Sequence, residues 1–167
     1  MPNKYTFKVR PLLEIIQRYK RPHEQWVDPF AGQYSPAEIT NDLNPRMPTQ
    51  YHLEAADFLE TLGRFDGVIF DPPYSLTQVS RSYQEIGLKF KGKENPTGGF
   101  PRVRDLIAQK LRIGGVCISY GWNTVGMGVT RGFRLVEVLC CCHGGNRNDT
   151  LVVVERKVKV WRSDADR

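Results

Sequence analysis

The tetrapeptide Asp71-Pro72-Pro73-Tyr74 carries the residue types that group transfer to an aromatic amine requires. The lone pair of such an amine is delocalised into its ring, so the nitrogen reacts only when it is drawn towards tetrahedral geometry. The Asp71 carboxylate and the Pro72 carbonyl can accept the two amino hydrogens, and the two prolines fix the direction of that carbonyl in advance. Tyr74 offers a flat face for a base pulled from its stack. A proline-rich turn that only ends a buried strand is the alternative interpretation.

Three more acidic residues lie near the ends of predicted strands. Asp28 opens the segment Asp28-Pro29-Phe30-Ala31-Gly32, in which Gly32 lets the backbone approach a ligand closely and Asp28 can hold an ammonium group. Asp42 can accept both hydroxyls of a ribose, and Asp57 is then placed to meet the adenine of the same cofactor. Each acid alone also fits a solvated surface position. Together with Asp71, they predict one ligand-binding edge.

The elements that must position these residues alternate between strand and helix. Amphipathic patterns predict helices at 11–19, 55–62 and 103–111, the last one stopping at Gly114-Gly115. Strands are expected at 25–30, 37–42, 51–53, 65–70, 116–120, 133–142 and 150–158, with a hairpin at Gly144-Gly145-Asn146. This order predicts an α/β fold, Rossmann-like, with a seven-stranded, mostly parallel sheet and a C-terminal antiparallel hairpin. Ligands of such sheets bind at the carboxyl ends of the strands.

The composition predicts one cytoplasmic domain over residues 1–167. Its 167 residues, 40% of them hydrophobic, suffice for a core without disulfides. The N-terminal segment lacks the apolar centre of a signal peptide, and no apolar run is long enough to span a membrane. A net charge of +6 is compatible with a polyanionic partner.

Two segments mimic other sites. Cys140-Cys141-Cys142-His143 suggests zinc, but consecutive side chains of a strand point to opposite faces, so no metal site is predicted. Gly87 to Glu94 imitates a phosphate-binding loop, yet Glu94 replaces the hydroxyl that would bind magnesium and no strand leads into the segment. Nucleotide hydrolysis is therefore not predicted.

The ordered set Asp28 to Gly32, Asn41-Asp42-Leu43-Asn44-Pro45, Asp57 and Asp71 to Tyr74 resembles the amino-methylating DNA methyltransferases, especially the small adenine-specific enzymes of phages and other mobile elements. Gly121-Trp122-Asn123 and the segment from His143 to Thr150 extend this resemblance over nearly the whole chain. The resemblance implies S-adenosylmethionine as cofactor and the N6 amino group of adenine in DNA as target. The segment from Lys8 to Pro11 resembles the one that closes over the methionine end of the cofactor. The implied catalytic residues are Asp71, Pro72, Pro73 and Tyr74, and the implied cofactor-binding residues are Lys8, Pro11, Asp28, Pro29, Phe30, Ala31, Gly32, Asp42, Leu43, Asp57, Phe58 and Asp71.

Nucleic-acid contacts are expected from two segments, because the chain shows no separate target-recognition domain. The stretch from Ser75 to Pro101 reads as a partly helical, basic loop, and the hairpin at 143–149 is the second candidate. A short or relaxed recognition site follows from this expectation. A solvated loop and ordinary hairpin-turn chemistry are the alternatives. The candidate residues are Ser75, Arg81, Lys89, Lys91, Lys93, Arg147 and Asn148.

One departure from the family pattern is the short connection between Gly32 and Asp42. Ten positions hold no complete crossover helix, which predicts an open methionine end of the cofactor site. Three alternatives stay open: methylation of the amino group of cytosine, methylation of an RNA base, and a catalytically silent subunit that binds nucleic acid. The sequence predicts no oligomeric state.

Overall fold

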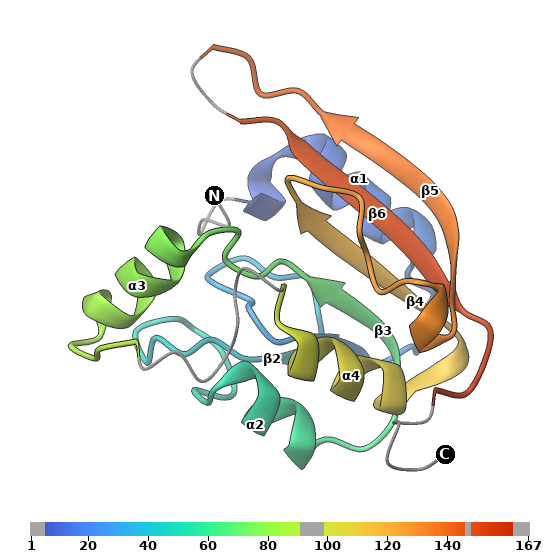
Figure 1. Ribbon diagram of the computed structural model, residues 1–167, viewed down its shortest axis with the longest axis horizontal. Helices are drawn as coiled ribbons and strands as arrows, with labels where there is room; N and C mark the ends of the chain where they lie inside the picture. The colour runs from blue at the N-terminus through green and yellow to red at the C-terminus, as the bar shows by residue number, and fades with distance from the viewer. Residues whose placement is uncertain (1–5, 91–98, 146–147, 162–167) are drawn as a thin grey trace.

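The computed structural model describes residues 6–90, 99–145 and 148–161. Its centre is a six-stranded sheet in the order β2-β1-β3-β4-β6-β5 (Figure 1). The pairs among β2, β1, β3 and β4 are parallel, whereas β6 runs antiparallel to β4 and to β5. The strands are β1 (Trp26–Asp28), β2 (Ile39–Thr40), β3 (Phe65–Phe70), β4 (Leu111–Gly121), β5 (Phe133–Cys141) and β6 (Thr150–Lys157).

Helices cover both faces of the sheet. One face carries α1 and the other carries α2 and α4, while α3 lies beyond the ends towards which β3 and β4 point (Figure 1). None of the described helices is long and apolar enough to cross a membrane. The helical elements are η1 (Thr6–Lys8), α1 (Arg10–Tyr19), α2 (Ala55–Thr61), α3 (Leu76–Glu85), α4 (Pro101–Lys110) and η2 (Val129–Arg131).

Alternation along β3 explains how one strand serves two cores. Val68 and Phe70 pack in the cluster that contains α2 and α4, whereas Ile69 packs in the cluster that contains α1. Gly67 is required beside β1, because a Cβ atom there would lie 2.1 Å from the ring of Trp26. The fully buried indole of Trp26 therefore rests on the backbone of β3 and fixes how closely the two strands approach.

One of the seven predicted strands, at 51–53, is reduced to a single parallel bridge between Asn41 and Tyr51. The reason is the side chain of Asn41. Its amide nitrogen donates to the Leu53 carbonyl at 3.0 Å, and its amide oxygen accepts from the Leu53 backbone N–H at 2.9 Å. A side chain thus takes the backbone groups that a longer strand would use.

The predicted end of the last helix at Gly114-Gly115 is also wrong. Helix α4 ends at Lys110, and β4 begins at the next residue. The ammonium group of Lys157, buried in β6, donates to the carbonyls of Ala108 and Leu111, which provides the stop that sequence reading assigned to the glycines. Residues 29–38 contain no helix, in agreement with the short connection predicted between β1 and β2.

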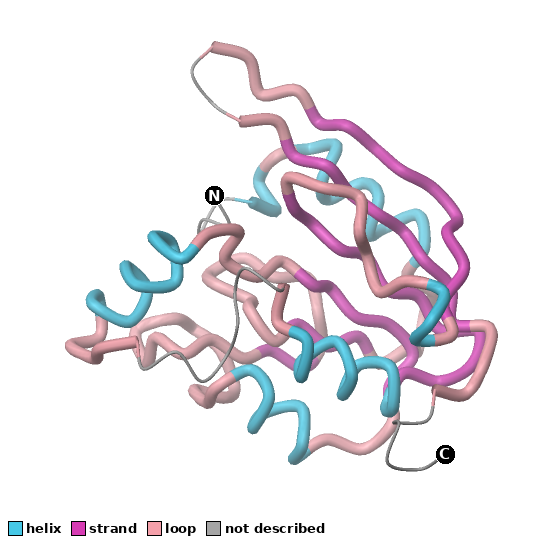
Figure 2. Tube along the Cα trace, viewed as in Figure 1, coloured by secondary structure: helices cyan, strands magenta, loops and turns pink. Residues whose placement is uncertain are grey.

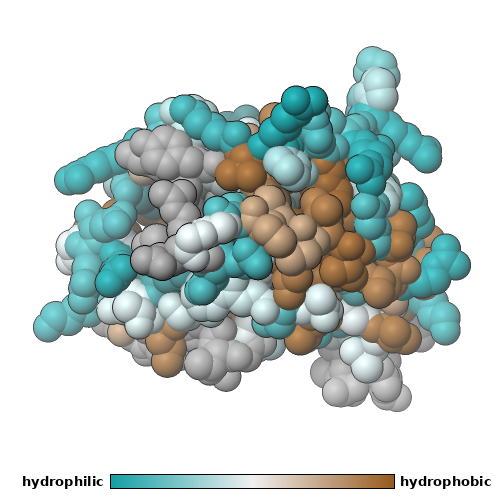
Figure 3. Space-filling view, turned by 90° about the horizontal axis from the view of Figure 1, so that it is seen from above, coloured by the Kyte–Doolittle hydropathy of each residue, from teal (hydrophilic) through white to brown (hydrophobic). Residues whose placement is uncertain are grey.

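The outermost strand, β5, leaves apolar side chains in solvent. Leu135, Val136 and Val138 are exposed along it. The face of the molecule seen from above carries a hydrophobic area among hydrophilic residues (Figure 3). This face is therefore not uniformly hydrophilic, and apolar areas of this kind are typical of contact surfaces.

Candidate active site

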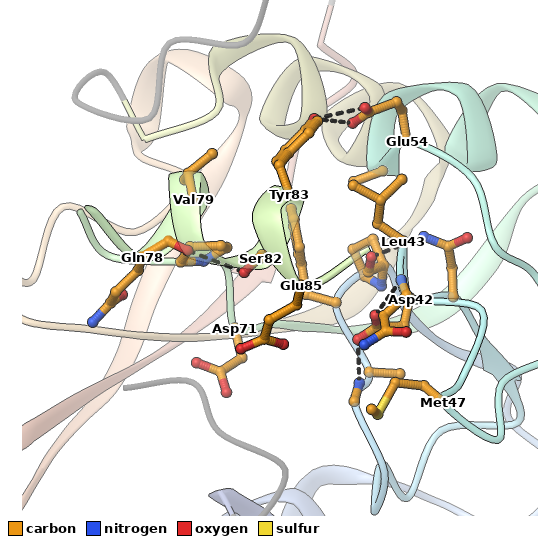
Figure 4. A pocket seen from close by; sticks show the side chains of 18 of the residues that line it. Asp42, Leu43, Met47, Glu54, Asp71, Gln78, Val79, Ser82, Tyr83 and Glu85 are labelled. Carbon is orange, nitrogen blue, oxygen red and sulfur yellow. Dashed lines mark hydrogen bonds between the residues drawn. The ribbon is translucent and has the colours of Figure 1, made fainter. Parts of the chain in front are cut away.

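A pocket of about 460 Å³ lies at the carboxyl ends of β1, β2 and β3, beneath α3 (Figure 4). Its volume falls in the range of small-molecule sites. Loops gather between these strand ends and α3 (Figure 2), which is where sheets of this kind bind their ligands. Seven of the residues proposed for the cofactor lie in its wall: Pro29, Phe30, Ala31, Gly32, Asp42, Leu43 and Asp71.

The glycine turn after β1 is tied to the end of β2. Gly32 adopts a left-handed backbone conformation with φ of 57°, which explains the glycine at this position. Its N–H donates to Oδ2 of Asp42 at 3.0 Å, and the N–H of Ala31 donates to the Asn41 carbonyl at 2.9 Å. The loops that follow β1 and β2 therefore form one wall of the pocket.

Asp42 is positioned as a fixed acceptor. Its Oδ1 takes the backbone N–H of Asn44 at 2.8 Å, and its Oδ2 takes that of Gly32. Burial raises the pKa of this carboxyl, and the two backbone hydrogen bonds oppose that rise. A carboxylate has about four lone-pair positions, so Asp42 keeps acceptor capacity for ligand hydroxyls.

The carboxylate of Asp28 binds groups of the protein itself. It is fully buried and does not line the pocket. Its Oδ1 accepts from the N–H of Phe30 at 2.9 Å, and its Oδ2 accepts from the hydroxyl of Ser35 at 2.6 Å. Burial raises the pKa of Asp28 to about 7. In this structure Asp28 holds the glycine turn through Phe30 and the short connection through Ser35, and its contact with an ammonium group, directly or through water, stays a prediction.

The Asp71 corner reaches the same pocket as the glycine turn. Asp71 is only 2% exposed, yet it lines the pocket together with Pro73, whereas Pro72 is buried behind them. Burial raises the pKa of Asp71 to about 6, and hydrogen bonds with the side chains of Tyr74 and Thr6 act in the opposite direction. The carboxylate is thus held by two hydroxyl groups at the pocket wall.

The ring of Tyr74 is engaged by the protein rather than open to the pocket. Its hydroxyl donates to Oδ1 of Asp71, and its ring packs edge-on against Trp122 with the centroids 5.4 Å apart. Tyr74 does not line the pocket, so stacking of a base on its ring stays a prediction that would require this pair to rearrange.

A capping arrangement at the start of α3 braces the corner. The side chain of Ser75 accepts from the N–H of Gln78 at 3.3 Å, and Oε1 of Gln78 accepts from the N–H of Tyr74 at 2.6 Å. Gln78 lines the pocket, and sequence reading missed it. The signal was present, because Ser-x-x-Gln ahead of a helix is a capping-box pattern.

The acid beside α2 is Glu54 and not Asp57. Glu54 lines the pocket and accepts both of its bonds from the hydroxyl of Tyr83, at 2.6 Å and 2.7 Å (Figure 4). Asp57 is exposed and lies 3.7 Å from Arg102, and Phe58 is fully buried in the core. Asp57 and Phe58 do not line the pocket, because only the start of α2 borders it, and their contact with a ligand stays a prediction.

The N-terminal segment borders the pocket two residues earlier than expected. Thr6 and Phe7 line it, whereas Lys8 and Pro11 are exposed and do not. The Lys8 ammonium instead lies 4.2 Å from the centre of the Tyr34 ring. The segment therefore borders the pocket through Thr6 and Phe7, and contact of Lys8 and Pro11 with a cofactor stays a prediction.

The residues proposed for nucleic-acid contact are spread over several places. Arg81 lines the pocket from α3, Ser75 caps that helix, and Lys89 and Asn148 are exposed. Lys91, Lys93 and Arg147 lie outside the described residues.

Charge distinguishes the pocket from its surroundings. Among the described residues, four acidic ones line the pocket against one basic residue, Arg81, although the whole chain carries a net charge of +6. Such a wall favours a ligand with positive charge. The lining residues that sequence reading did not assign to the site are Thr6, Phe7, Asn41, Asn44, Met47, Leu53, Glu54, Ala55, Gln78, Val79, Ser82, Tyr83, Glu85 and Phe100.

No protein-family model matches the sequence, and no curated protein matches it either. Solved structures do match. TrmN from Thermus thermophilus aligns with a TM-score of 0.59 at 15% identity, over 89% of this chain and 49% of TrmN. This chain therefore spans about half the length of that protein.

Two further matches cover more of the other protein. The 1,6-didemethyltoxoflavin-N1-methyltransferase of Burkholderia thailandensis, solved with S-adenosylhomocysteine, has a TM-score of 0.61 at 14% identity, over 90% of this chain and 78% of its own. The N-methyltransferase NodS from Bradyrhizobium japonicum WM9 has a TM-score of 0.55 at 12% identity, over 90% of this chain and 96% of its own. At such identities the likeness concerns the fold, and the chain has the Rossmann-like fold of these methyltransferases.

Proposed function

We propose that this chain is an S-adenosylmethionine-dependent DNA methyltransferase that acts on the N6 amino group of adenine. One observation carries the proposal. Asp71 and Pro73 line the same pocket as Gly32 and Asp42, so an amine at the corner and a cofactor at the glycine turn would share one cavity.

The lining residues fit S-adenosylmethionine. Its sulfonium and ammonium groups suit a wall with four acids and one base. Asp42 keeps acceptor positions for the ribose hydroxyls, and Glu54 replaces Asp57 as the acid for the adenine amino group. Thr6 and Phe7 then border the methionine end. When bound, the cofactor supplies an electrophilic methyl group. Two structurally similar proteins, one a methyltransferase and one a putative methyltransferase, are solved with S-adenosylhomocysteine, which supports the assignment.

The residues of the corner orient the target amine. Ionised Asp71 accepts one amino hydrogen, and the Pro72 carbonyl accepts the other, which turns the nitrogen lone pair towards the methyl group. The hydroxyl of Tyr74 and the side chain of Thr6 hold the carboxylate in place. Gln78 fixes the backbone of the corner through Tyr74. The amino proton leaves to solvent after transfer.

DNA as the acceptor rests on the resemblance of the corner to the adenine-specific enzymes and on charge. The chain has 24 basic and 18 acidic residues, and Arg81 is the one basic residue among the described residues that line the acidic pocket, which leaves other described basic side chains for phosphates. Ser75, Arg81, Lys89 and Asn148 are the candidates for nucleic-acid contacts within the described residues.

The proposal is tested by incubating the purified chain with labelled S-adenosylmethionine and with DNA or RNA. The products are digested to nucleosides and identified by mass spectrometry. We expect N6-methyladenine from DNA, and none from an Asp71→Ala reaction. If methylcytosine or a methylated ribonucleoside is the only product, then cytosine or an RNA base is the acceptor instead of adenine in DNA. Calorimetry that finds no binding of the cofactor, with or without DNA, would instead favour a silent partner subunit.

A further inference from the structure

Three side chains that can ligate a metal ion meet at the end of the β5–β6 hairpin, outside the pocket. They are the exposed thiols of Cys140 and Cys142 and the exposed carboxylate of Asp149, and their ligand atoms all lie within 4.8 Å of one another. In the described part of the chain, no other cluster of at least three histidine, cysteine or acidic side chains comes this close together.

Strand geometry brings the two thiols to one side. Residues two positions apart on a strand project to the same face, and the Sγ atoms of Cys140 and Cys142 are 4.0 Å apart. Cys141, between them, projects to the opposite face and is buried in the cluster that contains α1. The expectation of no metal site rested on consecutive side chains, and Cys140 and Cys142 are not consecutive.

The spacing of the thiols matches that of zinc ligands. In a tetrahedral site with zinc–sulfur bonds of about 2.3 Å, two thiolates lie roughly 3.8 Å apart. The observed separation of 4.0 Å therefore requires little movement.

Asp149 reaches this position from the other side of the hairpin. It directly precedes β6, and its Oδ1 accepts from the backbone N–H of His143 at 3.0 Å. That bond orients the carboxylate, as a supporting hydrogen bond does for metal ligands in general. An ion held by all three side chains would join the ends of β5 and β6 across the loop between them.

We propose that Cys140, Cys142 and Asp149 bind a thiophilic divalent transition-metal ion, with zinc as the best fit. Three protein ligands leave a fourth position for water. The ion acts as a clip that fixes the end of the hairpin. This site is independent of the proposed methyl transfer, because none of its residues lines the pocket.

The test uses the full chain, reduced and freed of metal, with Co²⁺ alone as the probe. We expect one equivalent of Co²⁺ to produce thiolate-to-metal charge-transfer absorption, and Zn²⁺ to remove it. The double variant Cys140→Ser/Cys142→Ser should lose this absorption. Asp149→Asn should weaken binding at least about tenfold, since loss of a direct ligand exceeds the effect of losing an outer partner. Circular dichroism checks that each variant is folded.

Cys141→Ala is the matched control, because it removes the thiol between the two ligands on the other face of the strand. It should bind Co²⁺ with the wild-type spectrum and stoichiometry. The proposal is overturned if the double variant keeps the charge-transfer absorption, if Cys141→Ala loses it while still folded, or if the wild-type chain binds no Co²⁺ at micromolar concentrations.

Discussion

The phenol hydroxyl of Tyr74 donates a hydrogen bond to the carboxylate of Asp71, three residues before it. The sequence predicts the Tyr74 ring as a stacking surface for a base. In the structure, the hydroxyl of Tyr74 contacts Asp71, which is proposed to bind the target amine. Burial raises the pKa of Asp71 to about 6, and this hydrogen bond works against that rise. Tyr74 therefore helps to keep Asp71 ionised at neutral pH.

Tyr74→Phe should move the acidic limb of the activity profile to higher pH. Transfer needs ionised Asp71, so wild-type activity should fall as the pH drops through about 6. The variant loses a hydrogen bond that favours the charged form, so its Asp71 should protonate at a higher pH. Measurement of kcat/KM over roughly pH 5 to 8 tests this, with Tyr19→Phe, remote from the pocket, as control. An acidic limb at the same or a lower pH in Tyr74→Phe would contradict the assignment of that limb to Asp71.

Asp28→Asn should stabilise the fold at alkaline pH. The pKa of Asp28 is raised from 3.8 to about 7 by burial, so the folded state favours the protonated form. Protonated Asp28 therefore contributes to the free energy of unfolding. This contribution is fully present below about pH 4 and is lost as the pH rises through about 7. Asparagine keeps an acceptor for Phe30 and gains a donor for Ser35 without any charge. The variant's advantage should reach the order of a few kcal/mol at pH 8.

Urea denaturation of the wild type and of Asp28→Asn at about pH 5 and pH 8 measures that difference. The difference in the free energy of unfolding between the two proteins should widen towards pH 8. A gap that is the same at both pH values would show that Asp28 is not held protonated in the folded state.

Glu54 and Asp57 provide a paired test of the cofactor site. Glu54→Gln should weaken binding of S-adenosylhomocysteine about tenfold, since one hydrogen bond to a charged acceptor contributes on the order of 1.5 kcal/mol. Asp57→Asn should stay within about twofold of the wild type, because Asp57 is exposed and does not line the pocket. Calorimetric measurement of S-adenosylhomocysteine binding by both variants shows which of the two acids contacts the cofactor. The reverse order would restore the sequence-based assignment.

Gln78 should act on the rate through the geometry of the corner. Gln78→Ala removes the acceptor of the Tyr74 N–H and should lower kcat about tenfold, because small displacements of positioned groups are costly, with cofactor binding unchanged. Gln78→Glu retains an oxygen for this bond and should recover most of the rate. Gln84→Ala, on the same helix and exposed, is the control. Equal losses in Gln78→Ala and Gln78→Glu would argue against a positioning role.

The sheet could be predicted because its strands carry local signals. The apolar run Phe65–Phe70 stops at Asp71, and the glycines at 144–145 separate β5 from β6, so both features were visible in the sequence. The end of α4 was not, because Lys157 stops that helix from a strand 46 positions further along the chain. Likewise, the side chain of Asn41 shortens the strand expected at 51–53 through contacts that only the fold creates.

The candidate site was predictable where spacing alone decides which residues meet. Gly32, Asp42 and Asp71 follow strands that lie side by side, and the pocket unites them. Glu54 and Asp57 could not be separated by spacing, because the choice depends on where α2 begins. The contribution of α3 was missed because the stretch that holds it showed no clear periodicity.

Single-turnover methyl transfer by Asp71→Asn tests the central claim most directly, with the dissociation constant for S-adenosylhomocysteine measured on the same preparation. The account predicts a rate for methylation of adenine in duplex DNA at least about 100-fold below that of the wild type, as for the loss of one preorganised group that acts in the transition state. Cofactor binding should stay within about twofold. A rate near that of the wild type, or a loss of binding large enough to explain the lower rate, would contradict a role for Asp71 at the reacting amine.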